Sequence, residues 1–262
     1  MIERACQGDR PTSAIPMKRR VKAILRWAAT QRVLGKCLDP LARSFHYIWK
    51  YRDSVENTSL GQAERREVLN LIDSIGDERG FLLNEREAFF LYCAVKGTTK
   101  VEGDLAEVGV FQGASAKLIC EAKGDRHLYL FDTFEGLPDP SDADNKRQYQ
   151  FSAGQYLSDV DSVKSYLSDY RCVSIVKGMF PATVDVIAEV KKFSFVHLDV
   201  DLYQSTHDCI EYFYPRMSRG GIIISHDYVL ASGVRKAVDE FFSDKPEPVI
   251  ELCENQCVIV KT

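Results

Sequence analysis

The stretch Asp104-Leu-Ala-Glu-Val-Gly-Val-Phe-Gln-Gly-Ala-Ser115 decides the fold class of this chain. Its first half is apolar enough for a buried strand, and Gly109 and Gly113 allow the turn that follows to bend sharply and to approach a ligand. From Ala114 to Glu121 the apolar residues recur at helical spacing. A strand that passes through a glycine turn into a helix is typical of open α/β sheets, which bind ligands at the carboxyl ends of their strands.

A second apolar segment, Leu128-Tyr-Leu-Phe-Asp132, also reads as a strand, and it ends in a carboxylate 25 residues after Glu107. An acid at the end of the second strand can accept hydrogen bonds from both ribose hydroxyls of a nucleoside. Taken singly, Glu107 could cap a helix and Asp132 could open a loop. The pair at this spacing indicates an adenosine-type ligand.

The glycine turn has the order Glu-x-Gly-x-x-x-Gly and lacks the Gly-x-Gly-x-x-Gly pattern that seats a pyrophosphate on a helix N-terminus. The carboxylate of Glu107 would repel phosphate and suits a cationic amine or sulfonium. S-adenosylmethionine combines an adenosine, an amine and a sulfonium without any phosphate, so the sequence favours this cofactor.

The whole chain has 262 residues, of which 45% are hydrophobic, and a net charge of −4. This composition fits one α/β domain with an N-terminal extension, and no apolar run is long enough to span a membrane. The eight cysteines are scattered, which favours reduced thiols in a cytoplasmic protein. We expect no nucleic-acid partner, and a homo-oligomer stays open.

Strand and helix patterns alternate from residue 103 onward, which indicates a largely parallel sheet with helices on both faces. Strands are expected at 105–110, 127–132, 172–177, 193–199, 221–226, 248–252 and 256–261, and helices at 113–123, 158–169, 181–190, 204–217 and 232–243. The short link Glu254-Asn255 predicts a hairpin. The expected fold class is therefore a Rossmann-like α/β fold, with a mostly parallel seven-stranded sheet, a C-terminal antiparallel hairpin and an N-terminal helical extension.

We expect two parts: an N-terminal basic and helical extension or lid at 1–100, and a cofactor-binding domain at 101–262. All charged residues from Arg10 to Cys37 are basic, and apolar residues among them recur at helical spacing. Such a helix can lie on an anionic membrane surface or pack on the domain with its charges solvated. Further helices are expected at 60–75 and 84–95, the latter with Asn84 as N-cap. No apolar segment typical of a secretory signal follows the charges.

Acidic residues also follow two later strands. One strand ends in Asp199-Val-Asp201 and the next in His226-Asp227. Because the carboxyl ends of parallel strands share one edge of a sheet, Asp199 and Asp227 are expected to face the glycine turn and to share a hard cation such as Mg²⁺. Such an ion lowers the pKa of a bound hydroxyl, and a nearby carboxylate can accept the proton. The alternative for Asp201 and Asp227 is a helix N-cap.

Five ordered segments resemble the macrocin O-methyltransferase family: Glu107-Val-Gly-Val-Phe-Gln-Gly113, Phe131-Asp-Thr-Phe-Glu-Gly-Leu-Pro138, Asp199-Val-Asp-Leu-Tyr-Gln-Ser-Thr206, Tyr214-Pro-Arg-Met-Ser-Arg-Gly-Gly221 and His226-Asp-Tyr228. The resemblance covers roughly residues 80–262. It implies a class I S-adenosylmethionine-dependent fold and methylation of a hydroxyl, as members methylate sugars of macrolide and aminocoumarin antibiotics. It also implies a cofactor site of Glu107, Gly109, Gly113, Ser115 and Asp132, with Asp199 as metal ligand and base and Asp227 as second metal ligand.

The chain departs from this family at His226, since the characterised sugar enzymes have paired aspartates after the fifth strand. Imidazole is a poor ligand for Mg²⁺ and a good one for Mn²⁺, Fe²⁺ or Zn²⁺. Three alternatives follow: a different metal such as Mn²⁺ bound by Asp199, His226 and Asp227, a weakly bound metal, or His226 as base without a metal. His226 could also be a hydrogen-bonded core histidine.

Two other functions are compatible with the sheet. An NAD(P)-dependent nucleotide-sugar oxidoreductase needs a phosphate-binding glycine cluster and a Tyr-x-x-x-Lys pair, and neither stands where it should. A non-catalytic methyltransferase-fold protein has no physical reason to keep four converging carboxylates. The acceptor, a small molecule with a hydroxyl, is expected to contact the N-terminal helical part, the 133–157 loop and residues 228–233.

Overall fold

The computed structural model describes residues 62–144, 150–190 and 192–262. Contacts divide the chain into two units, Met1–Arg65 and Arg66–Thr262, and the second contains the whole sheet. The predicted basic helix between Arg10 and Cys37 lies outside the described residues. Within the described ranges no helix has both the length and the apolar character needed to cross a membrane.

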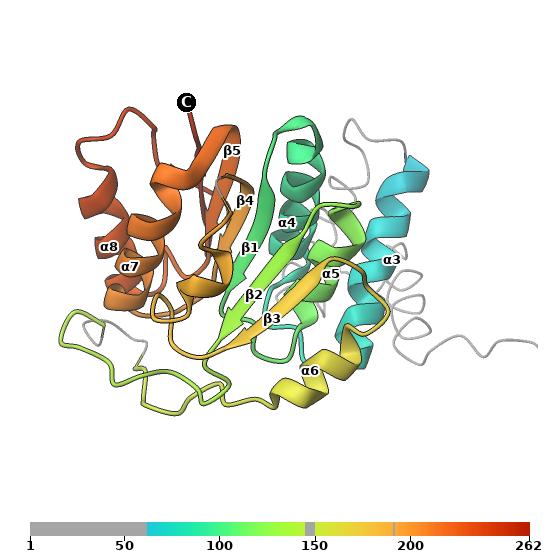
Figure 1. Cartoon of the computed structure of the whole chain (residues 1–262), viewed down its shortest axis with the longest axis horizontal. Coiled ribbons are helices and arrows are strands. Elements are labelled where there is room, and N and C mark those ends of the chain that lie inside the picture. Colours follow the sequence, from blue (N-terminus) through green and yellow to red (C-terminus); the bar gives the residue numbers. More distant parts are fainter. Residues whose placement is uncertain (1–61, 145–149, 191) are drawn as a thin grey trace, which may run out of the picture. The chain divides into compact units, whose positions relative to one another are not determined.

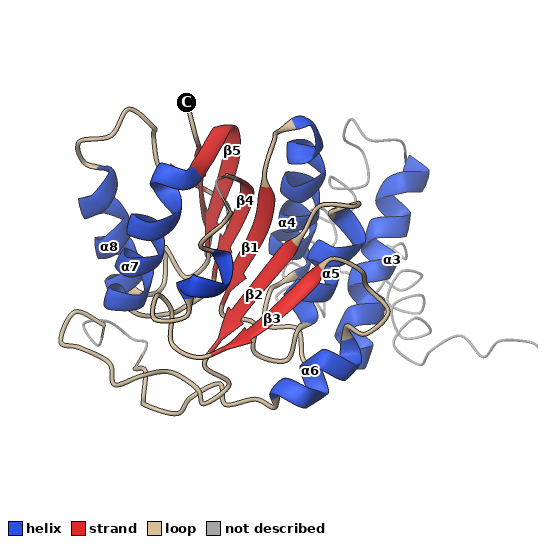
Figure 2. Ribbon diagram, viewed as in Figure 1, coloured by secondary structure: helices blue, strands red, loops and turns tan. Residues whose placement is uncertain are grey.

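A seven-stranded sheet forms the centre of the second unit (Figures 1 and 2). In spatial order its strands are β3 (Val173–Lys177), β2 (Leu128–Asp132), β1 (Asp104–Val108), β4 (Phe193–Leu198), β5 (Met217–Ser225), β7 (Cys257–Val260) and β6 (Ile250–Glu251). Strands β1 to β5 are parallel, and β7 runs antiparallel to both of its neighbours. The predicted α/β fold with a C-terminal antiparallel hairpin is therefore confirmed.

Helices cover both faces of this sheet (Figure 1). The α-helices of the described residues are α3 (Gln62–Glu78), α4 (Glu85–Gly97), α5 (Ala114–Ala122), α6 (Val160–Tyr166), α7 (Tyr203–Phe213) and α8 (Ser232–Phe242). Short 3₁₀ helices occur at Thr98–Lys100, Val184–Ile187 and Tyr214–Arg216. Helices α4 and α5 pack on one face, and α7 and α8 pack on the other.

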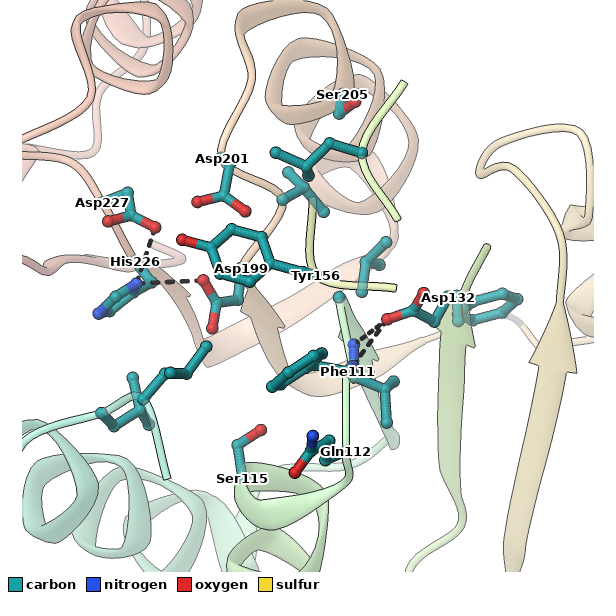
Figure 3. A pocket seen from close by; sticks show the side chains of 18 of the residues that line it. Phe111, Gln112, Ser115, Asp132, Tyr156, Asp199, Asp201, Ser205, His226 and Asp227 are labelled. Atoms are coloured by element: carbon teal, nitrogen blue, oxygen red, sulfur yellow. Dashed lines mark hydrogen bonds and ion pairs between the residues drawn. The ribbon is translucent and has the colours of Figure 1, made fainter. Parts of the chain in front are cut away.

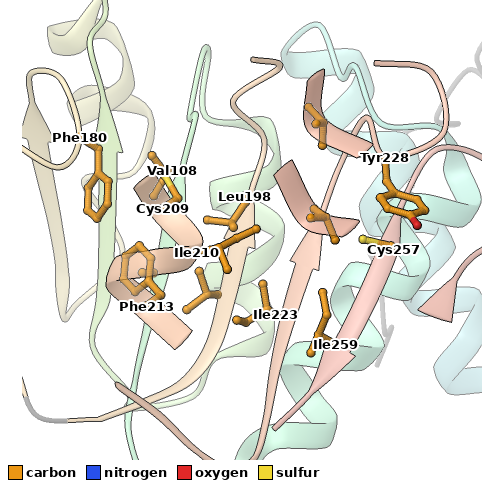
Figure 4. Packing of buried hydrophobic residues seen from close by; sticks show 14 of the residues in the cluster. Val108, Phe180, Leu198, Cys209, Ile210, Phe213, Ile223, Tyr228, Cys257 and Ile259 are labelled. Atoms are coloured by element: carbon orange, nitrogen blue, oxygen red, sulfur yellow. The ribbon is translucent and has the colours of Figure 1, made fainter. Parts of the chain in front are cut away.

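The core lies between the sheet and helix α7 (Figure 4). All six residues of β4 are buried, as expected for a central parallel strand covered on both faces. Phe213 of α7 stacks on Phe180 with 5.2 Å between ring centroids. Leu198 of β4 and Ile223 of β5 contribute to the same core from the sheet. Burying one such side chain contributes about 1.5–3 kcal/mol, so this layer holds β4 and β5 in register.

Several predicted elements differ in length from those observed; for example, the helix expected at 204–217 ends at Phe213, and the strand expected at 221–226 begins at Met217. The helix expected at 181–190 is only the 3₁₀ turn Val184–Ile187, because the β-branched residues in this segment lose side-chain freedom in a helix. The helix expected at 158–169 is shortened to α6, since Asp159 accepts hydrogen bonds from the backbone of the first turn and so acts as its N-cap. The strand expected at 248–252 contains only Ile250–Glu251.

The predicted N-cap of α4 is confirmed. The Asn84 side chain accepts hydrogen bonds from the backbone N–H groups of Arg86 (2.9 Å) and Glu87 (3.1 Å). In return the backbone N–H of Asn84 donates to Oε2 of Glu87 at 2.9 Å. This reciprocal arrangement is a capping box, and it fixes where α4 starts and where the Glu87 carboxylate lies.

A buried carboxylate ties the end of the chain to the fold. Glu247 is 2% exposed and accepts hydrogen bonds from Lys261 Nζ (2.6 Å) and the Tyr214 hydroxyl (2.7 Å). Burial raises the pKa of Glu247, but Lys261 and Tyr214 more than reverse this and lower it to about 2. A group with a lowered pKa stabilises the fold above its unfolded pKa, and this contribution is lost as the pH falls through the folded value.

We therefore expect Glu247→Gln to reduce the free energy of unfolding by roughly 1.5–3 kcal/mol at pH 7. The difference from wild type should shrink as the pH falls from 4.5, the ordinary value, toward 2. Urea unfolding across this pH range measures it. Glu251→Gln, at an exposed ion pair with Arg235, is the matched control and should have little effect. Equal effects of the two variants would contradict the assignment.

Candidate active site

A cavity of about 500 Å³ opens at the carboxyl ends of β1, β2, β4 and β5. The order of the sheet reverses between β1 and β4, so the loops that follow these two strands diverge and leave a crevice. The start of α4 and the turn of the C-terminal hairpin complete its wall. Figure 3 shows the polar side chains that point into it. Its size and position are those of a small-molecule site.

The glycine turn after β1 touches the loop after β4. Gly109 has φ +89°, and a Cβ added to it would lie 1.8 Å from the carbonyl oxygen of Asp199. The backbone N–H of Asp199 donates to Val108 O at 2.9 Å, and that of Gly109 donates to Phe131 O at 2.9 Å. Only glycine fits here, and the contact brings the predicted cofactor turn against the residue predicted as base.

Asp132 lies in the wall of the cavity, as predicted, but its carboxylate already accepts hydrogen bonds from three backbone N–H groups. Its Oδ2 accepts hydrogen bonds from the backbone N–H groups of Val110 (2.7 Å) and Phe111 (2.8 Å). Its Oδ1 accepts one from Phe134 N at 2.6 Å. Roughly four acceptor positions are available on a carboxylate, so about one remains for a ligand. Asp132 therefore organises the glycine turn in addition to any contact with ribose.

Glu107 does not line the cavity, which corrects the expectation that its carboxylate faces a cationic ligand. Glu107 is fully buried on β1, and its Oε1 lies 2.8 Å from Nδ1 of His197. His197 is the residue of β4 that stands opposite Glu107 in the parallel pairing of the two strands. Burial raises the pKa of Glu107, and its interaction with His197 opposes this rise. Because side chains alternate along a strand, Val108 faces the core beneath α7, and Glu107 points to the opposite layer.

Two other predicted cofactor residues lie at the start of α5. Ser115 lines the cavity, whereas Gly113 does not. Gly113 is the N-cap of α5 with φ +84°, and the position of its missing Cβ is 3.2 Å from the side chain of Val163 on α6. Gly113 therefore allows α6 to approach the turn.

Asp199, His226 and Asp227 converge in the cavity, as predicted from their places at two neighbouring strand ends (Figure 3). Nδ1 of His226 lies 3.1 Å from Oδ1 of Asp199 and 2.9 Å from Oδ2 of Asp227. Its other ring nitrogen, Nε2, lies 3.7 Å from Oε2 of Glu87. One imidazole is thus surrounded by three carboxylates.

These carboxylates control the protonation of His226. Burial lowers the pKa of His226, but Asp199, Asp227 and Glu87 reverse this and raise it far above the ordinary range. Burial raises the pKa of Asp199, and His226 brings it below its usual value. At neutral pH this arrangement holds an imidazolium beside a carboxylate. A protonated imidazole cannot accept a proton, so Asp199 is better placed than His226 to act as base.

The same three residues fit a divalent ion. Ligand atoms bound in cis positions about 2.1 Å from an octahedral ion lie about 3.0 Å apart. The separations from Nδ1 of His226 to the oxygens of Asp199 and Asp227 match this spacing, and all three atoms lie within 4.8 Å of one another. Two carboxylates with one imidazole suit Mn²⁺ or Fe²⁺ better than Mg²⁺.

Asp201 and Tyr156 are two site residues that the sequence did not identify as such. Asp201 has φ +60°, is 8% exposed and lines the cavity. Burial raises the pKa of Asp201, and the nearby charges of Asp227 and Asp199 raise it further. The N-cap of α7 is Leu202, so the N-cap role considered for Asp201 is not observed.

Tyr156 comes from the long connection between β2 and α6 and has φ +65°. Figure 3 shows its hydroxyl among three carboxylates, those of Asp199, Asp201 and Asp227. Burial raises the pKa of this hydroxyl, and the three carboxylates add to the effect. No local pattern in the sequence marks Tyr156, because its loop carries no strand or helix periodicity.

The cavity is acidic inside and apolar at part of its wall. Its carboxylates are Glu87, Asp132, Asp199, Asp201, Asp227 and Glu254, and no lysine or arginine lines it among the residues that the structure describes. Leu82, Met179 and Leu230 also line it although they are 59%, 43% and 43% exposed. Such a wall suits a neutral or cationic molecule with an apolar part.

Curated relatives are sugar O-methyltransferases. The chain is 31% identical over 154 residues to the 8-demethyl-8-(2,3-dimethoxy-alpha-L-rhamnosyl)-tetracenomycin-C 4'-O-methyltransferase of Streptomyces olivaceus, a match that covers 54% of this chain and 58% of that protein. It is 31% identical over 156 residues to the mycinamicin III 3''-O-methyltransferase of Micromonospora griseorubida, covering 54% and 61%. The chain therefore spans less than two thirds of the length of these relatives.

Solved structures give the same picture of the fold. The O-methyltransferase NovP superposes with a TM-score of 0.62 at 25% identity, over 70% of this chain and 82% of that chain. The calicheamicin methyltransferase CalS11 superposes with a TM-score of 0.59 over 98% and 99% of the two chains, and at 15% identity it shows the fold alone. The family model Macrocin-O-methyltransferase (TylF) matches residues 91–260, which is more than half of the sequence, and the chain belongs to this family.

Proposed function

We propose that this protein transfers a methyl group from S-adenosylmethionine to a sugar hydroxyl of a glycosylated small molecule. The observation that carries the proposal is the contact between the glycine turn and Asp199, because the turn that we expect to bind the cofactor and a carboxylate then line the same cavity. Family membership and the sugar O-methyltransferases among the relatives support it.

The cofactor would occupy the part of the cavity around Gly109, Ser115 and Asp132. When bound, S-adenosylmethionine supplies a methyl group on a sulfonium to an oxygen nucleophile. The backbone N–H groups of Val110 and Phe111 donate hydrogen bonds to Asp132, so they are not free to bind a phosphate. The acidic cavity suits the cationic sulfonium.

Asp199 is the proposed base. It is ionised at neutral pH because His226 lowers its pKa, so it can take the proton that the acceptor hydroxyl loses as its oxygen is methylated. A divalent ion held by Asp199, His226 and Asp227 would lower the pKa of a bound hydroxyl and so offset the weak basicity of Asp199. The Tyr156 hydroxyl can donate a hydrogen bond to another oxygen of the sugar, and the Asp201 carboxyl can form a hydrogen bond with another of its hydroxyls.

The acceptor is proposed to be a glycoside without phosphate. The cavity carboxylates disfavour a nucleotide diphosphate, and Leu82, Met179 and Leu230 offer apolar contacts to the part of the acceptor beyond the sugar. A panel of macrolide and aromatic glycosides alongside nucleotide-diphosphate sugars, assayed for methyl transfer, tests this. Faster turnover of the nucleotide sugars would contradict the assignment.

We expect Asp132→Ala to weaken binding of S-adenosylhomocysteine by roughly 10- to 100-fold, since a set of charge-assisted hydrogen bonds is worth about 1.5–3 kcal/mol. The variant loses both the support of the glycine turn and the acceptor position for ribose. Isothermal calorimetry measures the affinity. Glu135→Ala, an exposed carboxylate of the same loop, is the control and should bind normally. Unchanged affinity in Asp132→Ala would place the cofactor elsewhere.

The metal preference is expected to depend on His226. Wild type should be more active with Mn²⁺ or Fe²⁺ than with Mg²⁺, and His226→Asp should shift the preference toward Mg²⁺ because that ion prefers oxygen ligands. Metal binding at an imidazole displaces a proton, so the apparent affinity should fall as the pH is lowered. Side-by-side metal titrations of both proteins measure this. Identical metal preferences in the two proteins, or full activity after EDTA treatment, would show that His226 is not a ligand of a required metal ion.

The oxidoreductase alternative is tested more simply. A thermal-shift comparison of S-adenosylhomocysteine, NAD and NADP should show stabilisation by the first ligand alone. Stabilisation by a dinucleotide instead would support the alternative.

A further inference from the structure

Glu87 takes part in both the start of helix α4 and the wall of the cavity. It is the third residue of α4, where it completes the capping box with Asn84, yet it is only 5% exposed and lines the cavity. Its Oε2 accepts from Asn84 N at 2.9 Å, and its Oε1 accepts from Asn255 N at 3.0 Å. Both oxygens are therefore fixed by backbone donors, one from the helix start and one from the C-terminal hairpin.

This immobile carboxylate faces the imidazole of the site. Oε2 of Glu87 lies 3.7 Å from Nε2 of His226, on the side of the ring away from Asp199 and Asp227. A small rotation of the ring closes this ion-pair distance to a hydrogen bond. With its Nε2 proton shared with Glu87, the ring presents Nδ1 to the other two carboxylates.

Asn255 extends this support to Asp227. Its Nδ2 donates to Oδ1 of Asp227 at 2.5 Å, and its Oδ1 accepts from Leu230 N at 2.8 Å. One oxygen of Asp227 is thereby occupied, and the other, Oδ2, is left 2.9 Å from Nδ1 of His226. Glu87 accepts a hydrogen bond from the backbone N–H of Asn255, and together these two residues support His226 and Asp227, which follow β5.

We propose that Glu87 is a positioning residue that accepts the Nε2 proton of His226, so that Nδ1 offers its lone pair to a divalent transition ion shared with Asp199 and Asp227. The inference rests on the metal site of the proposed function. A metal-binding histidine commonly donates its other ring N–H to a carboxylate, which fixes the ring orientation and strengthens the ligand. Loss of that carboxylate typically weakens metal binding by about 10- to 100-fold.

A purely structural role for Glu87 makes a different prediction. The capping box accepts glutamine as well as glutamate at this position, so Glu87→Gln can keep the hydrogen bond from Asn84 N while removing the charge and the hydrogen bond from Asn255 N. Asn84→Ala removes the cap from the same helix end and leaves the Glu87 charge in place. These two variants separate the support of α4 from the support of His226.

The experiment titrates Mn²⁺ into the full chain with saturating S-adenosylhomocysteine and follows binding by electron paramagnetic resonance. We expect Glu87→Gln to weaken Mn²⁺ binding by about 10- to 100-fold. Asn84→Ala should bind Mn²⁺ as wild type does while melting at a lower temperature. Pulsed measurements should detect a coupled nitrogen in wild type that disappears in His226→Asp.

Wild-type Mn²⁺ affinity in Glu87→Gln, an equal loss in Asn84→Ala, or no coupled nitrogen in wild type would overturn the inference. If Glu87→Gln does not fold, Glu87→Asp replaces it, since it keeps a negative charge at the start of the helix but withdraws the carboxylate from Nε2 of His226, and it should also weaken Mn²⁺ binding. Binding of S-adenosylhomocysteine is measured in every variant. If the wild-type protein binds this ligand but no Mn²⁺, only the present inference is contradicted. If it binds no S-adenosylhomocysteine, the proposed function is contradicted.

Discussion

Asp199→Asn is expected to lower kcat for methyl transfer by about 10²- to 10⁴-fold, the range that general-base residues contribute. The amide keeps the shape of the side chain but cannot take the proton of the acceptor hydroxyl. It also removes one carboxylate from the cluster around His226, so a bound divalent ion would be held less tightly. Steady-state kinetics with saturating S-adenosylmethionine and acceptor measure the effect.

Two controls separate the chemistry from damage to the fold. Affinity for S-adenosylhomocysteine should be unchanged in Asp199→Asn, because the contact with the glycine turn is made by the backbone carbonyl of this residue. Asp185→Asn, at an exposed position of a 3₁₀ helix, should keep full activity. If Asp199→Asn turned over at the wild-type rate, Asp199 would not be the base.

Gly109→Ala is expected to have the largest effect on the fold around the cavity. The new Cβ would lie 1.8 Å from the Asp199 carbonyl oxygen, and φ at this position is +89°. The backbone conformation alone costs an L-residue about 1–2 kcal/mol, and the clash forces the loops after β1 and β4 apart. We expect a loss of several kcal/mol in the free energy of unfolding, roughly 3 or more, together with loss of cofactor binding.

Gly124→Ala is the matched control for this substitution. Gly124 has φ +64°, so it bears the same kind of backbone strain, but a Cβ there meets nothing within 4 Å. It should destabilise the protein by only about 1–2 kcal/mol and leave S-adenosylhomocysteine binding intact. Urea unfolding and calorimetry compare the two variants. Equal losses in both would show that strain, and not the contact with Asp199, makes Gly109 necessary.

The convergence of Asp199, His226 and Asp227 could be predicted from the sequence for a simple reason. Each follows a run of apolar residues that reads as a buried strand, and neighbouring parallel strands end at the same edge of a sheet. The pattern of apolar residues therefore determines both the sheet and the meeting of these side chains. The glycine turn was predictable from its two glycines, Gly109 and Gly113, which adopt positive φ angles without strain.

The role of Glu107 was not predictable in this way. Its place in the motif suggested a ligand contact, but alternation along β1 sends its side chain to the layer opposite Val108, where it meets His197. Which layer receives a given side chain depends on the register of the strand, and a motif does not specify it.

By itself, the sequence determined the α/β fold, the family, and the edge of the sheet where Asp199, His226 and Asp227 meet, because local periodicity and strand order are sufficient for these. Only the tertiary structure decided what surrounds them. Glu87 comes from the start of a helix and Asn255 from a hairpin turn, and neither has a local signal for a second partner. Packing places them beside His226 and Asp227, and contacts between residues so distant in the chain arise from the three-dimensional arrangement of whole elements.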